Sequence, residues 1–248
     1  MTQTRFHTLA DGTRLAFRHH AGHGPAVVFL PGYMSDMAGG KACAVLDWCV
    51  AAGRECLLLD YSGCGQSDGR FADGTLTKWQ GEVLALIGAQ VASDRVVLVG
   101  SSMGGWLMLL VGGALGARLG GLLGIAAAPD FTDWGYSEGQ KAQLAAGQTV
   151  LEDNPYGPDP TPTHAAFWAD GQANLMLAGG VPLNVPVRLL HGQDDGDVPP
   201  AVSFRLAAAL HSPDVQVTMV KGGDHRLSRD GDIALLLRTV AALVQDLP

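Results

Sequence analysis

The chain has 248 residues and a formal net charge of −8, from 24 acidic and 16 basic side chains. A chain of this length buries a large core without disulfides or metal ions, and it suits one large α/β domain. The acidic balance argues against nucleic acid or an anionic membrane surface as a partner. Glycines interrupt the longest apolar stretches, so we expect no stable membrane insertion.

The cysteines and the N-terminus give an expectation for the compartment. The four cysteines form no C-x-x-C pair and have no zinc-ligand spacing, so we expect buried free thiols in a reducing compartment. Residues 1–7 contain no apolar signal region. We therefore expect a soluble, cytoplasmic protein. The cysteines are Cys43, Cys49, Cys56 and Cys64.

The first third of the chain alternates between predicted strands and helices. Residues 5–9 and 14–18 flank an Asp-Gly pair and are typical of a β-hairpin. A buried strand is predicted at 26–30, a helix at 39–52 and a second buried strand at 55–60. A helix is also predicted at 75–92. Asp60 ends the second of these buried strands, where we expect it to organise the following loop.

The third buried strand, 95–99, enters the pentapeptide Gly100-Ser101-Ser102-Met103-Gly104, and an apolar helix pattern follows over 106–119. This strand–turn–helix context is that of the nucleophile elbow G-x-S-x-G. The turn places Ser102 in a strained conformation with its Oγ at the apex. The two glycines lack bulk, so that strand and helix can pass closely. The following helix points its N-terminus at developing negative charge.

Three further buried strands are predicted, at 121–127, 187–190 and 215–220, followed by an amphipathic helix at 233–247. Short apolar strands alternating with helices favour a parallel sheet covered on both faces. Ligands bind such sheets at the carboxyl ends of the strands, where the polar loops of this sequence fall. Residues 130–185 are too long for an ordinary connection and are expected to form a lid.

Ser102 needs a base, and the base needs a carboxylate. The best base is His225, in a Gly-rich loop after the sixth buried strand. The stretch H-G-Q-D-D-G-D-V-P offers three acids, of which Asp195 fits the form G-x-x-D-x-x-V-P, whereas Asp194 and Asp197 do not. The order Ser…Asp…His is that of the elbow-containing hydrolases. His225 would take the Ser102 proton, and Asp195 would fix its tautomer.

The oxyanion that forms during acyl transfer needs hydrogen-bond donors. We expect one to be the backbone N–H of Met103, the residue after the nucleophile. The other should come from the loop after the first buried strand, and the N–H of Tyr33 is the best candidate. Gly32 lets that loop approach closely.

The remaining histidines carry weaker patterns. His19, His20 and His23 lie close together in the sequence, but they lack an acidic partner pattern, so no metal site is expected. His191 begins a turn, and we expect it to be structural.

Five blocks of the sequence resemble the α/β-hydrolase superfamily. They resemble in particular the abhydrolase-domain branch that contains a mitochondrial acyl-protein thioesterase and acyl-glucuronide esterase. The resemblance runs from about residue 26 to the last helix and is weak over 130–185. It implies Ser102 as nucleophile with Asp195 and His225 as partners. The blocks are L-P-G-Y-M-S-D-M, L-D-Y-S-G-C-G-Q-S-D-G, V-G-S-S-M-G-G-W-L-M-L, R-L-L-H-G-Q-D-D-G-D-V-P and D-H-R.

Together these observations predict one α/β-hydrolase domain over residues 1–248, with a mostly parallel sheet and a small lid. The expected activity is that of a serine carboxylesterase or thioesterase acting through an acyl-Ser102 intermediate, without a cofactor. The substrate would be a small ester or acyl thioester, or an acylated protein. Trp134 and Trp168 are expected to line the acyl pocket, although they could instead pack the lid onto the body.

Two alternatives remain open at this stage. One is a cofactor-free perhydrolase that uses the same triad. The other is a non-catalytic, ligand-binding homologue of the hydrolases. A dehalogenase with an aspartate nucleophile is disfavoured, because the residue at the elbow is Ser102.

Overall fold

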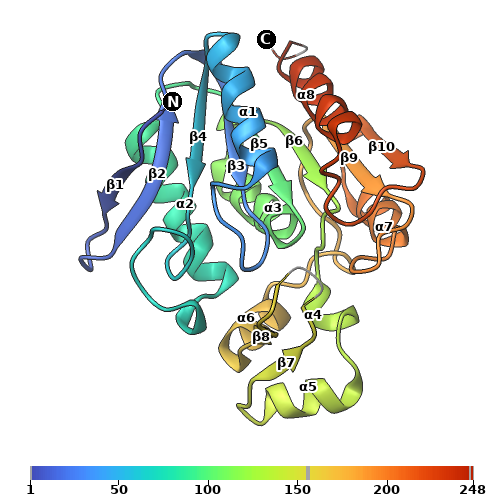
Figure 1. The fold of residues 1–248 in the computed structure, drawn as a ribbon. Helices are drawn as coiled ribbons and strands as arrows, with labels where there is room; N and C mark the ends of the chain where they lie inside the picture. The colour runs from blue at the N-terminus through green and yellow to red at the C-terminus, as the bar shows by residue number, and fades with distance from the viewer. Residues whose placement is uncertain (1, 155–156, 246, 248) are drawn as a thin grey trace.

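The computed structural model describes residues 2–154, 157–245 and 247. An eight-stranded sheet in the order β1-β2-β4-β3-β5-β6-β9-β10 forms its centre (Figure 1). The pairs β1–β2 and β2–β4 are antiparallel, and all other neighbours are parallel, so the predicted mostly parallel sheet is confirmed. The strands are β1 (Arg5–Thr8), β2 (Arg14–His20), β3 (His23–Leu30), β4 (Arg54–Leu59), β5 (Val96–Ser101), β6 (Leu119–Ile125), β9 (Val187–Gly192) and β10 (Val215–Val220).

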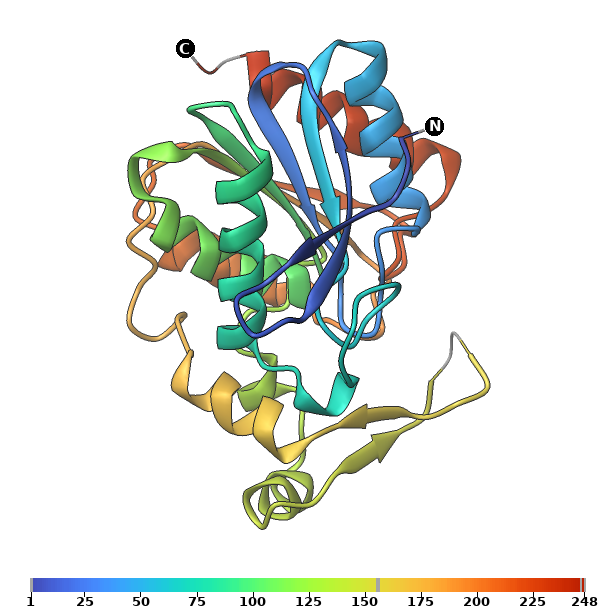
Figure 2. The same ribbon diagram turned by 90° about the vertical axis from the view of Figure 1, so that its left-hand side faces the viewer.

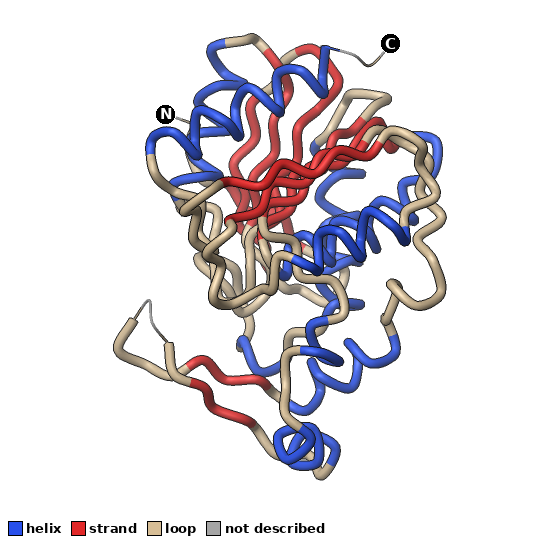
Figure 3. The backbone as a smooth tube through the Cα atoms, turned by 90° about the vertical axis from the view of Figure 1, so that its right-hand side faces the viewer, coloured by secondary structure: helices blue, strands red, loops and turns tan. Residues whose placement is uncertain are grey.

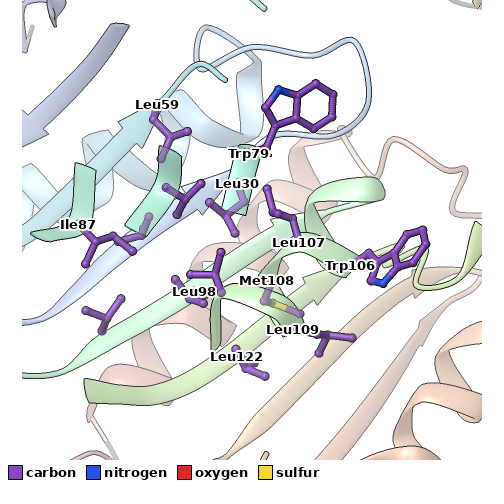
Figure 4. Packing of buried hydrophobic residues seen from close by; sticks show 14 of the residues in the cluster. Leu30, Leu59, Trp79, Ile87, Leu98, Trp106, Leu107, Met108, Leu109 and Leu122 are labelled. Carbon is purple, nitrogen blue, oxygen red and sulfur yellow. The ribbon is translucent and has the colours of Figure 1, made fainter. Parts of the chain in front are cut away.

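Helices cover both faces of the sheet (Figure 3). Because successive side chains of a strand point to opposite faces, Val28 and Leu98 enter one apolar core while Val27 and Val99 enter the other. Figure 4 shows part of the first core, in which Trp79 and Trp106 lie beside the strands. The first core holds α2 (Leu76–Gln90), α3 (Met103–Leu115) and α7 (Ala201–Ala209), and the second holds α1 (Gly40–Ala51) and α8 (Asp230–Gln245).

Several details of the body differ from the sequence prediction; the last helix, for example, begins at Asp230, three residues before its predicted start. The helix after the elbow ends at Leu115, four residues before the predicted end, because Gly116 has φ 54° and starts the short 3-10 helix Gly116–Arg118. Helix α7 is absent from the prediction. A second 3-10 helix, Phe71–Asp73, lies between β4 and α2. None of these differences changes the order of the strands.

Between β6 and β9 the chain leaves the sheet and forms a separate layer at one end of the body, seen at the bottom of Figure 1. We call residues 126–186 the insertion. In Figure 2 its β-hairpin extends away from its helices beneath the body. Pro155 and Tyr156, part of the predicted Pro-rich stretch, lie outside the described residues. The elements are α4 (Phe131–Trp134), α5 (Glu138–Ala145), β7 (Val150–Glu152), β8 (Thr161–Thr163) and α6 (Ala165–Ala173).

The insertion is closed at its base by one carboxylate. Asp130, at its start, accepts hydrogen bonds of 2.9 Å from the backbone N–H groups of Met176 and Leu177, near its end. Phe167 of α6 is 1% exposed and packs in the first core beside Trp79 of α2, with ring centroids 5.7 Å apart. Helix α6 is therefore part of the body's packing, while α5 and the β7–β8 hairpin lie further out.

Candidate active site

The elbow has the geometry that its glycines permit. Ser102 lies between β5 and α3 with φ 53° and ψ −121°, a left-handed conformation that a side chain rarely adopts. A Cβ on Gly100 would collide with the carbonyl of Gly104, and one on Gly104 would collide with the carbonyl of Leu30. Any larger residue at either glycine would push apart the segments that form the turn. The Ser102 N–H donates to the Ile125 carbonyl at 2.9 Å, which ties the turn to β6.

The three predicted site residues lie in one chain of hydrogen bonds. His225 Nε2 is 3.1 Å from Ser102 Oγ, and His225 Nδ1 is 2.9 Å from Asp195 Oδ2. Ser102 follows β5, Asp195 follows β9 and His225 follows β10. The parallel sheet brings these strand ends to one edge, so residues 123 positions apart in the chain meet there.

Asp195 is set apart from its two acidic neighbours by its hydrogen bonds. Its side chain is 0% exposed, and its Oδ1 accepts from the N–H groups of Asp197 and Val198, both at 2.9 Å. Burial favours the neutral acid, but hydrogen bonds from His191, His225 and the Val198 N–H outweigh it and hold the pKa of Asp195 well below its usual range. Asp195 therefore stays ionised where histidines titrate. Asp197 is not a member of the hydrogen-bonded series Ser102–His225–Asp195; its Oδ2 lies 4.0 Å from His225 Nε2.

Both predicted oxyanion donors lie beside the nucleophile. Met103 is the first residue of α3, and a Cβ on Gly32, next to Tyr33, would lie 3.4 Å from Ser102 Cβ. Among the described residues, neither the Met103 nor the Tyr33 N–H donates to a protein acceptor.

Asp60 is buried and accepts from the Met37 N–H at 2.7 Å and the Gln66 N–H at 2.8 Å. Its predicted loop-organising role is thereby confirmed.

Ser102 and His225 line a cavity of about 710 Å³ between the sheet edge and the insertion. This volume lies in the range of small-molecule sites. Aromatic side chains of the insertion form one wall: Phe131, Trp134 and Tyr136. Polar residues line other parts of the cavity, and they include Ser35, Asp36, Lys41, Asp153, Asp197 and Arg226.

The two predicted pocket tryptophans have different places. Trp134 lines the cavity, and its Nε1 donates to the Pro129 carbonyl at 2.8 Å. Trp168 does not line it. Its ring packs in the small core of the insertion, against Tyr136 and its neighbours, and its Nε1 donates to the Thr132 carbonyl at 3.0 Å. The expectation for Trp168 is therefore corrected, because α6 turns this side chain into the insertion and away from the cavity.

Sequence reasoning missed several residues around the site. His191 is not merely the start of a turn: it is the second-last residue of β9, and its Nε2 lies 3.0 Å from Asp195 Oδ2. The spacing of four residues between them was visible in the sequence, but it gives contact only in the turn formed here. Lys41 carried no local pattern. Its Nζ donates to the Arg226 carbonyl, and burial lowers its pKa.

The structure also bears on the membrane and on metal ions. No helix in residues 2–154 and 157–245 is long and apolar enough to cross a bilayer. In the same part of the chain, no three histidine, cysteine or acidic side chains are placed to share a metal ion. Of the three clustered histidines, His19 instead contacts the buried Glu55, with Nε2 3.0 Å from Oε1.

Comparison with known proteins places this geometry in a family. A model of the prolyl oligopeptidase family matches residues 81–246. The mouse protein "Palmitoyl-protein thioesterase ABHD10, mitochondrial" is 38% identical over 239 residues, which cover 94% of this chain and 80% of that protein. The solved structure of mouse ABHD10 superimposes with a TM-score of 0.89 at 34% identity, covering 97% and 98% of the two chains. A candidate hydrolase from Agrobacterium vitis S4 gives 0.90 at 35% identity, covering 98% of each chain.

The expected cytoplasmic location is wrong on this comparison. The mouse protein and the other mammalian relatives, at 34–38% identity, are named mitochondrial. Free thiols indicate a reducing environment but do not identify the organelle that provides it. An apolar signal region marks secretion, and mitochondrial transit peptides have a different, amphipathic character. Neither observation could therefore separate the two compartments.

These comparisons agree with the observed fold. The prolyl oligopeptidase model spans the elbow and the strands that follow it, and the two solved structures match nearly the whole chain. The predicted α/β-hydrolase resemblance is confirmed. By sequence and by fold, the chain belongs to the α/β-hydrolase family of hydrolytic enzymes.

Proposed function

We propose that this protein is a serine hydrolase that cleaves carboxylic esters and acyl thioesters through an acyl-enzyme on Ser102. The observation that carries the proposal is the hydrogen-bonded chain Ser102–His225–Asp195 in the wall of a cavity of about 710 Å³. A nucleophile, a base and an orienting carboxylate within hydrogen-bond reach are the arrangement that acyl transfer requires. A non-catalytic homologue would have no need of it.

In the acylation step, Ser102 Oγ attacks the acyl carbon while its proton passes to His225 Nε2. Asp195 stabilises the imidazolium that forms. The negative charge on the acyl oxygen falls between the N–H groups of Met103 and Tyr33, and the N-terminus of α3 adds a favourable field. The bond to the leaving oxygen or sulfur then breaks, and the leaving group takes the proton from His225.

In the deacylation step, water takes the place of the leaving group. Its proton passes to His225 Nε2, its oxygen adds to the acyl carbon, and the bond to Ser102 Oγ breaks as Oγ recovers the proton. The products are a carboxylic acid and free enzyme. Every proton has an acceptor in this scheme, so the side chains and backbone groups described here suffice for the proposed reaction.

The cavity supports an acyl chain on one side and a polar leaving group on the other. Phe131, Trp134 and Tyr136 offer an apolar wall for the acyl chain. The polar residues of the cavity, among them Lys41 and Arg226, suit a larger leaving group such as the side of an acylated protein or a sugar acid. Among these substrates, S-acyl proteins are supported by the name of the mammalian relatives, palmitoyl-protein thioesterase.

The test is a substrate panel with two nucleophile variants. Acetate, butyrate, octanoate and palmitate esters of p-nitrophenol, the matching acyl thioesters and an S-palmitoyl peptide are incubated with wild type, Ser102→Ala and Ser102→Gly. Both variants should lose turnover by at least about 10⁴-fold, because the nucleophile is absent. Ser102→Gly is the matched control for folding, since glycine adopts φ 53° without strain.

An acyl-enzyme should accumulate as a burst of p-nitrophenol and as a covalent adduct on the peptide that contains Ser102. Unchanged turnover in both folded variants would overturn the proposal. Turnover of oxygen esters without any thioester cleavage would restrict it to an esterase.

A further inference from the structure

A second histidine, which the proposed reaction does not use, is buried behind the triad acid. His191 is the second-last residue of β9 and is 0% exposed. Its Nε2 lies 3.0 Å from Asp195 Oδ2 and 3.0 Å from the Val198 carbonyl oxygen. Its Nδ1 lies 2.7 Å from Ser203 Oγ of α7, which is itself 1% exposed. The ring is thus fixed from three directions by β9, the loop that holds Asp195, and α7.

The partners of the two ring nitrogens define where the proton is. Nε2 faces a carboxylate and a carbonyl, which are both acceptors, so it carries the hydrogen. Nδ1 faces the Ser203 hydroxyl, which donates to it. A neutral His191 therefore satisfies all its contacts. A buried neutral donor aimed at a carboxylate stabilises the ionised acid without adding charge.

With this contact, four N–H groups face the Asp195 carboxylate: three donate hydrogen bonds to it, and the fourth, that of His191 Nε2, is shared with the Val198 carbonyl. Two backbone N–H groups, those of Asp197 and Val198, bind Oδ1 at 2.9 Å, while His191 and His225 bind Oδ2 at 3.0 Å and 2.9 Å. The backbone groups fix one oxygen. The other oxygen is shared between the two histidines, and only one of them takes part in proton transfer.

We propose that His191 is a positioning residue for the reaction, holding Asp195 Oδ2 in place against the pull of His225. The inference rests on the proposed function, because it acts through the triad. When His225 becomes an imidazolium, its attraction for Asp195 Oδ2 rises. His191 then keeps this oxygen from moving toward the imidazolium. The second donor also lowers the basicity of Asp195, so the proton stays on His225.

Three substitutions separate this role from simple packing. His191→Leu keeps the bulk but removes the donor. His191→Gln places an amide N–H at the reach of Nε2 and an amide oxygen near the Ser203 hydroxyl. His191→Asn is one methylene shorter, so it contacts Ser203 but not Asp195. Because Gln and Asn are similarly polar, this pair remains informative if His191→Leu does not fold.

The measurement is kcat and KM for p-nitrophenyl butyrate, with thermal unfolding of each variant. His191→Leu and His191→Asn should lower kcat about 10–100-fold and leave KM within about twofold, as expected for a lost hydrogen bond to a charged group. His191→Gln should recover most of kcat. If Gln and Asn show the same kcat, the proposal is overturned.

A double-mutant cycle with Asp195→Asn gives the second readout. If His191 acts through Asp195, adding His191→Leu to Asp195→Asn should slow kcat less than about threefold further. Full additivity of the two losses would show that His191 acts elsewhere and would overturn the proposal. Wild-type activity in Asp195→Asn alone would instead overturn the proposed function, so the two failures are distinguishable.

Discussion

Two regions of the molecule meet at the cavity, and they are built differently. The sheet edge supplies Ser102, Asp195 and His225, each from the loop after a strand of the parallel sheet. The insertion supplies Phe131, Trp134 and other wall residues from short helices and a two-stranded hairpin. Figure 2 shows the hairpin extending outside the body, whereas the sheet edge lies within it.

The forces that hold the two regions differ as well. The strands that lead to the site are held between two apolar layers by side chains such as Val97 and Leu98 of β5, both 0% exposed. The insertion has only a small apolar core of its own, around Leu144 and Val150, and polar contacts add to it, such as the 2.7 Å hydrogen bond between Tyr136 and Thr163. Each such bond contributes only about 0.5–1.5 kcal/mol. The difference suggests a division in which the body fixes the chemistry and the insertion sets the substrate range.

The largest expected effect tests the body. Asp195→Asn should lower kcat by roughly 10⁴-fold, because loss of the carboxylate leaves His225 in the wrong tautomer. Asp194→Asn and Asp197→Asn are matched controls in the same loop and should cost less than about tenfold. The measurement is kcat on p-nitrophenyl butyrate, with folding checked by circular dichroism. A dead Asp197→Asn beside an active Asp195→Asn would reverse the assignment.

An intermediate effect tests the insertion through its two tryptophans. Trp134→Ala should raise KM for octanoate esters about tenfold and leave acetate esters unchanged, since a non-reacting chain is bound equally in ground and transition states. Trp168→Ala is the matched control. Its free energy of unfolding should fall by about 2 kcal/mol and its Tm by about 4–8 °C, while its relative activity should be the same on every ester. The measurement is KM for acetate, butyrate, octanoate and palmitate esters in both variants, which separates a residue that lines the cavity from one that packs the insertion.

Chain-length selectivity that shifts in Trp168→Ala but not in Trp134→Ala would contradict the cavity wall as described. An equal loss on all four esters in both variants, tracking Tm, would assign both rings to packing alone.

The smallest expected effect lies at one hydrogen bond between the body and the β7–β8 hairpin of the insertion. Tyr33 Oη donates to the Pro162 carbonyl of β8 at 3.0 Å, while its ring packs 4.9 Å from Phe71 and 4.8 Å from Phe167. Tyr33→Phe keeps the ring, so kcat should stay within about threefold. Amide exchange in β8 should quicken by about 2- to 10-fold. A kcat loss above about 30-fold would show that the hairpin sets the oxyanion loop.

The same division explains what could be predicted from the sequence. The core strands read as apolar runs, because both faces of a parallel sheet are buried, and their order in the chain places Ser102, Asp195 and His225 on one edge. The elbow follows from its glycines, whose missing side chains make room for a carbonyl. These features depend on residue type and spacing alone.

The remaining features depend on contacts that spacing does not encode. Strands β7 and β8 have three residues each, too few for a period to be recognised. The sequence could not show which way Trp168 faces, because α6 is set by its packing on α2. Helix α7 is the exception, because the two prolines before it are a helix-start pattern in the sequence itself. The contact between His191 and Asp195 required the turn itself.

The Asp130 carboxylate has a consequence for how this enzyme could diverge. By joining the start of the insertion to the N–H groups of Met176 and Leu177, it makes the enclosed chain a closed loop whose ends stay fixed. Each doubling of a flexible loop's length costs only about 0.6 kcal/mol in closure entropy. Outside α6, which packs on the body, the sequence between the two ends can therefore be lengthened or exchanged while the strand ends keep their places. A changed insertion can therefore alter the cavity wall while Ser102, Asp195 and His225 stay as they are.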